Sequence, residues 1–149
     1  MIDTHCHFDM MPQPETYIRQ RELAGDIVIG MTNLPSHFQV GQPHLRGYKH
    51  IRLALGMHPL LATESKIEVP LFKRLVDQTS YIGEIGLDFS KKAYATKDGQ
   101  VAVLREVLSA IRGKNHILYL ILTKQSQQFF FCLARMNTDY LLFATNSRS

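Results

Sequence analysis

Short apolar runs alternate with amphipathic segments along the first three-quarters of this chain. The apolar runs predict strands at residues 1–5, 26–32, 51–57, 81–87 and 117–122. The segments between them predict helices at residues 14–24, 36–46, 70–77 and 98–112. Strands that alternate with helices at this spacing are typical of a parallel sheet joined by crossover helices. The pattern therefore predicts an α/β fold, and a small doubly wound sheet remains one alternative.

The pattern changes after Gly113. All nine glycines lie at or before this residue, and the last of the six prolines is Pro70. Beyond it lie two contiguous apolar patches, at residues 129–131 and 140–143, with neither helical spacing nor strict alternation. A helix over residues 125–136 fits this composition. A peptide read out of frame would look the same.

Composition narrows the class of protein. With 149 residues, of which 45% are apolar, the chain can bury a core. Cys6 and Cys132 are its only cysteines, which favours a reduced cytoplasmic protein over a disulfide framework. The sequence shows no secretory signal and no apolar run that would span a membrane. The net charge of +4 is weak evidence for nucleic acid, because most of the excess follows residue 112, where Asp139 is the only acidic residue.

Two histidines close the first predicted strand. His5 and His7 are two residues apart, so their side chains share one face of a strand. Imidazole is a common metal ligand, and the pair therefore predicts a metal site. Ordinary polar residues at a strand end are the alternative. Cys6 lies between them and is expected on the opposite face, packed against a helix, because a thiolate ligand would need the other face.

Two later strands also carry polar residues. Glu84 interrupts an apolar strand between Gly83 and Gly86, and a buried carboxylate is costly unless it is paired or metal-bound. A salt bridge is the alternative to a metal ion. His58 follows the third strand and either faces the site or stabilises the turn before Pro59. Active sites of parallel β/α barrels are built from residues at such strand ends.

These motifs together resemble those of the TatD-type metal-dependent nucleases. The matching segments are residues 3–7 (DTHCH), 56–59 (GMHP) and 83–88 (GEIGLD), in matching order and spacing. The resemblance covers residues 1 to about 120, and the segment from His58 to Ala62 most resembles the TatD-like member of Qat anti-phage systems. It implies a (β/α) TIM barrel of the metal-dependent hydrolase type, which needs about 250 residues, so that only its amino-terminal half is expected here.

The resemblance also implies a site. His5 and His7 would hold one divalent metal ion, and Glu84 would bridge it to a second, without distinguishing Mg, Mn or Zn. Two ions roughly 3.5–4 Å apart can activate water and hold the leaving oxygen of a phosphodiester. His58 would be catalytic, over the substrate phosphate, and Asp88 would orient a histidine or cap a helix. The remaining histidines fit no motif and are expected on the surface or in packing: His37, His44, His50 and His116.

The implied function is hydrolysis of DNA in anti-phage defence, with DNA as substrate and other Qat-type defence proteins as partners. A catalytically inactive fragment or interaction module is one alternative. A phosphatase or amidohydrolase on the same scaffold is another.

The domain organisation expected from the resemblance divides at the fifth strand. Residues 1–122 are expected to form the amino-terminal half of the barrel, and 123–149 an aberrant or unassigned tail. A frameshift in the codon of Leu120 would permit a histidine-serine segment of the kind family members carry there; a genuine short variant is the alternative. The family completes its site with later histidines and an aspartate, but no histidine follows His116 and position 121 is Ile. We therefore expect an incomplete site and negligible nuclease activity.

Overall fold

The computed structural model describes residues 1–134 and 141–146. Within them, one parallel sheet holds six strands in chain order. The strands are β1 (Ile2–Cys6), β2 (Ile27–Met31), β3 (Ile51–Met57), β4 (Tyr81–Leu87), β5 (Ile117–Leu122) and β6 (Leu141–Asn146). Every neighbouring pair is parallel.

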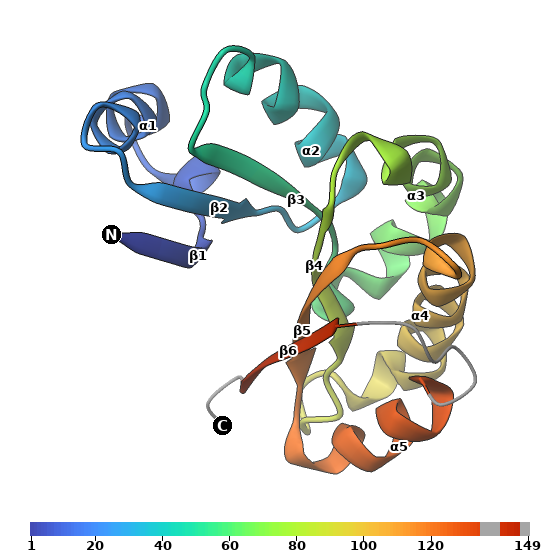
Figure 1. The fold of residues 1–149 in the computed structure, drawn as a ribbon. Coiled ribbons are helices and arrows are strands. Elements are labelled where there is room, and N and C mark those ends of the chain that lie inside the picture. Colours follow the sequence, from blue (N-terminus) through green and yellow to red (C-terminus); the bar gives the residue numbers. More distant parts are fainter. Residues whose placement is uncertain (135–140, 147–149) are drawn as a thin grey trace.

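The helices lie on the outer side of a curled sheet (Figure 1). They are α1 (Pro14–Leu23), α2 (Pro35–Gly41), α3 (Ala62–Leu75), α4 (Lys97–Ile111) and α5 (Lys124–Ala134). Each of the first four connects a strand to the parallel strand beside it. This is the half-barrel of β/α type that the family resemblance implies, and the doubly wound alternative is not observed.

The strands are apolar on both faces because both faces are covered. On the side of the helices, Leu53 and Leu55 of β3 belong to the main core together with Phe38 of α2 and Leu104 of α4. On the inner side of the curl, a smaller cluster holds Ile29, Met31, Ala54 and Tyr119. Burial on two faces explains why the strands appear as unbroken apolar runs in the sequence.

Three predicted strands match the structure at both ends: β3, β4 and β5. Helix ends also follow the local signals. Pro14 opens α1, and Gly25 follows it with a φ of +69°, a conformation that favours glycine.

Two predicted helix starts are wrong. Helix α3 begins at Ala62, not at Pro70, which lies inside it. Proline is a good start signal, but burial of Ala62 and Ser65 favours a helix that begins earlier. Helix α2 begins at Pro35 with Leu34 at its cap position, so Ser36, where the predicted helix starts, lies inside it and is not its cap. Instead, the Ser36 backbone N–H and hydroxyl each donate a hydrogen bond to the Glu68 carboxylate at 2.8 Å.

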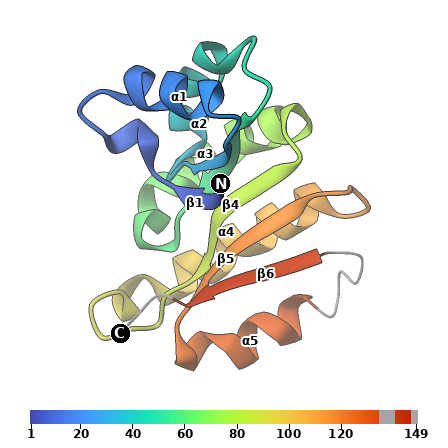
Figure 2. The same cartoon turned by 60° about the vertical axis from the view of Figure 1, so that its left-hand side comes forward.

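The βα alternation continues beyond residue 122. Helix α5 follows β5, and β6 pairs with β5 from Ile117–Leu141 to Leu122–Asn146. Figure 2 shows β6 beside β5 above α5. The helix predicted over residues 125–136 corresponds to α5, and its last two residues lie outside the described part, as do Asp139 and residue 140. The reading of this segment as an aberrant tail stays a prediction.

None of the helices in the described residues is both long and apolar enough to span a membrane.

Candidate metal centre

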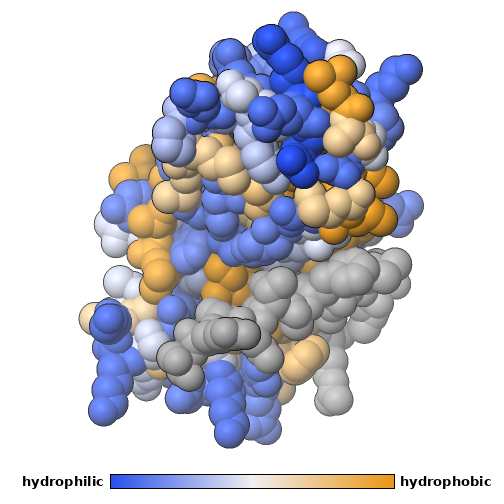
Figure 3. Space-filling model, turned by 90° about the vertical axis from the view of Figure 1, so that its left-hand side faces the viewer, coloured by the Kyte–Doolittle hydropathy of each residue, from blue (hydrophilic) through white to orange (hydrophobic). Residues whose placement is uncertain are grey.

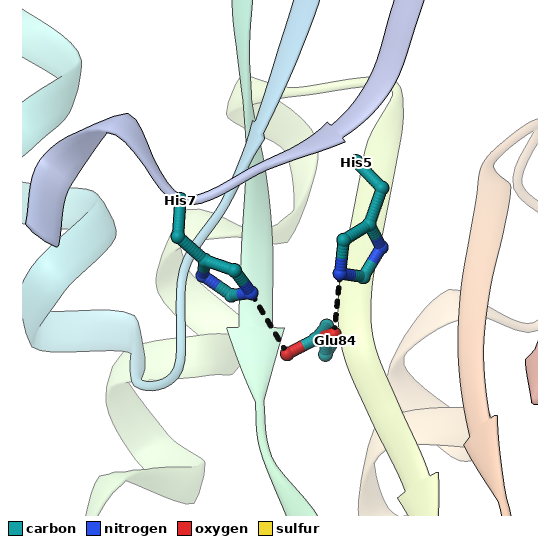
Figure 4. Close-up of side chains that lie close together, drawn as sticks. All are labelled: His5, His7 and Glu84. Carbon is teal, nitrogen blue, oxygen red and sulfur yellow. Dashed lines mark ion pairs between the residues drawn. The ribbon is translucent and has the colours of Figure 1, made fainter. Parts of the chain in front are cut away.

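Glu84 of β4 lies opposite the end of β1, across the inner side of the curled sheet. In strand order β1 and β4 are separated by two strands, and neighbouring strands are about 4.8 Å apart. The curl of the sheet therefore has to bring these side chains together. Figure 4 shows His5 and His7 pointing from the first strand and the residue after it toward the Glu84 carboxylate.

Each Glu84 carboxylate oxygen faces imidazole nitrogen. His5 Nε2 lies 2.8 Å from Oε1, and His7 Nε2 lies 3.4 Å from Oε2. His58 Nε2 lies 3.6 Å from Oε2. The structure thus brings together four residues that the sequence singles out. One detail differs: Glu84 stands in the middle of β4 rather than at its carboxyl end.

The geometry fits a divalent ion. Ligand atoms of His5, His7 and Glu84 all lie within 4.8 Å of one another. Atoms that share one zinc-like ion at about 2.1 Å lie roughly 3.0–3.5 Å apart, close to the observed separations. Two neutral imidazoles and a carboxylate also suit zinc and similar first-row ions chemically. The role of these residues as ligands stays a prediction.

Glu84 and the neighbouring histidines each stabilise the charged form of the other. Burial alone would raise the pKa of Glu84, but its hydrogen bond with His7 and the nearby His5 and His58 imidazoles hold that pKa below its usual value. The same contact with Glu84 raises the pKa of His7, against the lowering effect of burial. Glu84 is therefore an anion at neutral pH, the state in which it can bind a cation.

His58 both faces the site and stabilises the turn before Pro59, the two roles that the sequence leaves open. Its Nδ1 accepts a hydrogen bond from the backbone N–H of Leu60 at 3.1 Å, which fixes the turn. Its Nε2 faces Glu84. Burial lowers the pKa of His58, the Glu84 and Asp88 charges act in the opposite direction, and His7 adds to the lowering. The neutral ring consequently carries its proton on Nε2, where it can donate a hydrogen bond into the centre.

Asp88 caps a turn and not a helix. Its carboxylate accepts a hydrogen bond from the Ser90 backbone N–H at 2.8 Å. Gln100 of α4 holds the same residue, accepting from its backbone N–H at 2.8 Å and donating to its carbonyl at 2.9 Å. The predicted role of Asp88 in orienting a histidine stays a prediction.

Cys6 behaves as expected from strand alternation. It is buried, and its thiol donates a hydrogen bond to the Tyr17 hydroxyl of α1 at 3.6 Å. Burial, first of all, raises the pKa of the Cys6 thiol. The thiol therefore belongs to the helix-facing core, away from the metal ligands.

The residues just after β2 position the centre, and the sequence reasoning missed them. The Thr32 hydroxyl donates to the Ala54 carbonyl at 2.8 Å and accepts from the Gly56 N–H at 3.0 Å. The Thr32 carbonyl accepts from the Glu84 N–H at 3.3 Å, and the Asn33 carbonyl accepts from the His58 N–H at 2.9 Å. Polar residues directly after an apolar strand were the available signal.

Gly56 allows this close contact. A Cβ atom at that position would lie 1.6 Å from the Thr32 carbonyl oxygen. Only glycine lets β3 approach the end of β2 so closely.

The four histidines outside the motifs lie away from the centre. His50 pairs with Glu22, and His37 and His44 line a groove between α1 and α2. His116 is buried just before β5.

Known proteins share this fold. A family model for TatD-related DNases matches residues 2–128. An uncharacterized metal-dependent hydrolase of Buchnera aphidicola subsp. Baizongia pistaciae (strain Bp) is 21% identical over 127 residues, which cover 79% of this chain and 48% of that protein. The crystal structure of YJJV, a TatD homolog from Escherichia coli K12, is 26% identical with a TM-score of 0.74, covering 91% of this chain and 55% of that one.

The chain thus spans about half the length of these two relatives. The family match extends over all of β1 to β5 and into α5, and it contains every residue of the centre. The chain belongs to the TatD-related DNase family of metal-dependent hydrolases.

Proposed function

We propose that His5, His7 and Glu84 hold a divalent metal ion with which this protein hydrolyses phosphodiester bonds of DNA. The observation that carries the proposal is the convergence of two imidazoles and one ionised carboxylate within 4.8 Å. Family membership supports a divalent cofactor, and the family model is named for a DNase activity.

The surrounding residues fit phosphodiester chemistry. A bound divalent ion would supply a Lewis acid and lower the pKa of a coordinated water. Glu84 offsets part of its positive charge, while the two histidines bind as neutral ligands. His58, with its proton on Nε2, can donate a hydrogen bond to a phosphate oxygen, and its Nδ1 contact with Leu60 holds the ring in that orientation.

Hydrolysis of a single-stranded oligonucleotide, assayed with Mg²⁺, Mn²⁺ or Zn²⁺ and with a chelator, tests the proposal. E84Q should lower turnover by at least about 100-fold. Mutation of a residue that only hydrogen-bonds to a metal ligand already lowers activity by about 10–100-fold, and loss of the ligand itself should cost more. E106Q is the matched control, since Glu106 is an exposed glutamate paired with Lys73 on the helix side. Measurable turnover that is equal in E84Q and the unchanged protein would refute the assignment.

A second candidate function is metal binding without turnover. Within the described residues, the centre gathers three potential ligand residues, whereas the two-metal site implied by the family resemblance is completed by later histidines and an aspartate. Metal analysis separates the two functions. One ion per chain, released by chelator and unaccompanied by DNA cleavage, would favour the second candidate and the expected inactivity of this 149-residue chain. Cleavage that is lost in E84Q would favour the first.

We also propose a role in anti-phage defence, as the resemblance from His58 to Ala62 suggests. The partners would then be other Qat-type defence proteins. Plaque formation on cells that express the whole system with the unchanged chain or with E84Q tests this role. Equal phage resistance in both strains would contradict it.

A further inference from the structure

A polar cavity lies at the opposite end of the sheet from the metal centre. Its volume is about 570 Å³, and it opens where β3, β4 and β5 begin. This size falls within the range of small-molecule sites. The residues that matter for its chemistry are Arg46, Arg52, Asp77, Tyr81, Lys114 and His116.

The cavity carries an excess of positive charge. Lys114 and Asp77 pair with each other at 2.6 Å and largely cancel. Arg46 and Arg52 form no ion pair with any described residue. Arg52 is nevertheless held in place, because its Nη1 donates to the carbonyls of Ile51 at 2.8 Å and Tyr48 at 3.2 Å. Its second terminal nitrogen remains available for an anion.

A buried histidine lies in the same wall. His116 is 8% exposed, and within the described residues neither of its ring nitrogens makes a hydrogen bond of good geometry; the Thr79 backbone is a weaker polar contact. Burial and Lys114 lower the pKa of His116, against smaller opposite effects of Asp77 and the Thr79 backbone, so the ring is neutral. A buried polar side chain of this kind can hydrogen-bond a ligand that enters the cavity.

The rest of the wall suits an organic group. Tyr81, which is half-buried, supplies aromatic surface, and the side-chain amides of Gln42, Gln78 and Asn115 supply donors and acceptors. A lone inorganic anion would leave most of this volume unfilled.

We propose that this cavity binds a small phosphorylated ligand of nucleotide size, separate from the metal centre. Arginine is the side chain best suited to phosphate, because its planar fork can donate two parallel hydrogen bonds. Arg46 and Arg52 would contact the phosphoryl group, His116 would donate one hydrogen bond, and the Tyr81 ring would pack against the base.

Calorimetric titration of the full chain tests the proposal. The protein is kept in chelator, so that no phosphate can bind through a metal ion at His5, His7 and Glu84. AMP should bind at least about tenfold more tightly than adenosine, since the charged hydrogen bonds depend on the phosphoryl group. Inorganic phosphate is titrated as the third ligand. If phosphate binds as tightly as AMP, the cavity is a site for free phosphate and not for a nucleotide.

Variants locate the binding. R46Q and R52Q should each weaken AMP binding by about tenfold. R46Q is the safer variant for the fold, because Arg46 is exposed and its side chain makes no hydrogen bond within the described part of the chain, while its backbone N–H still donates to the Pro43 carbonyl. R74Q is the matched control, since Arg74 lies on α3 outside the cavity and its side chain donates a hydrogen bond to the Pro70 carbonyl of the same helix.

The proposal would be overturned by an absence of binding of AMP and phosphate, by equal binding of AMP and adenosine, by equal binding of AMP and phosphate, or by AMP binding that survives R46Q and R52Q. The outcome is independent of the metal centre, because E84Q should leave AMP binding in chelator unchanged. AMP binding that is lost in E84Q would instead assign the ligand to the metal centre.

Discussion

At the scale of single residues, Glu84 is the point on which the imidazoles of His5, His7 and His58 converge. We predict that E84Q lowers the affinity for a divalent ion by at least about 100-fold, because it removes the anionic ligand and keeps its shape. Competition with a chromogenic chelator measures this affinity. E106Q should behave like the unchanged protein, and an E84Q protein of undiminished affinity would disprove the assignment.

The pair of His7 and Glu84 also predicts how stability depends on pH in the metal-free protein. The raised pKa of His7 adds stability below its unfolded value of 6.5, which is lost as pH rises through the folded value. The lowered pKa of Glu84 adds stability above its unfolded value of 4.5, which is lost as pH falls.

Together these shifts predict that the pair contributes most between about pH 4.5 and 6.5. The Tm difference between the unchanged protein and H7Q, measured in chelator from pH 4 to 9, should be largest in that interval. With a divalent ion present the trend reverses, because binding displaces the His7 proton and affinity rises with pH. A Tm difference that is constant across this range would rule out the coupling.

Sequence reasoning found the side chains of the centre and missed the backbone that holds them. His5, His7 and His58 are polar residues at the ends of predicted strands, and Glu84 interrupts one; these signals are visible in the sequence alone. Thr32 contacts β3 through its hydroxyl and Glu84 of β4 through its carbonyl. These contacts depend on how β2, β3 and β4 pack, which the sequence does not show.

At the scale of elements, Gly56 decides how closely β3 can approach the end of β2. We predict that G56A lowers the free energy of unfolding by about 2–4 kcal/mol, because its Cβ would overlap the Thr32 carbonyl. Urea denaturation measures this change.

G99A is the matched control for the same substitution. Gly99 lies in α4, and its added Cβ would meet nothing closer than the Ala62 Cβ at 3.9 Å. Alanine in a helix should stabilise the protein by about 0.5–1 kcal/mol. Equal effects of the two variants would contradict the close approach at Gly56.

Elements with a clear period were predictable, and elements with a conflicting local signal were not. The strands β3 to β5 are buried on both faces, so their apolar runs end where the strands end. Helix α3 carries Pro70 in its interior, and its early start depends on packing that the sequence does not display. Ser36 has the composition of a cap, but it bonds to Glu68 from another helix.

At the scale of the whole molecule, the two outer strands each pair on one side only among the described residues. β1 and β6 form the edges of the sheet, and Ile2 on β1 is 69% exposed. Figure 3 shows apolar side chains among the polar ones on the face nearest β1. Unpaired edges of this kind favour association between copies.

We predict that the isolated chain self-associates in a concentration-dependent way, which sedimentation velocity can follow. I2K should shift the protein toward the monomer, because a charge on an edge strand opposes pairing. I67K is the control, since Ile67 is 79% exposed on α3, on the helix side. A monodisperse monomer that melts cooperatively would contradict this prediction.

The overall curvature was predictable only through the family resemblance. Alternating strands and helices fit an open sheet equally well, and the periodicity alone does not select between the two. The strand β6 was not predicted. The apolar residues around it are contiguous, so their spacing does not distinguish a strand from a helix.

The proposed metal ligands come from parts of the chain that are far apart in the sequence and are therefore synthesised at different times. His5 leaves the ribosome about 80 residues before Glu84, so the first strand is made long before its partner exists. An ion at this centre would close that long loop only after β4 has joined the sheet, and it would anchor an edge strand to the middle of the molecule. Amide exchange in β1 should accordingly slow on metal binding far more than exchange in β5, whose two neighbours already protect it.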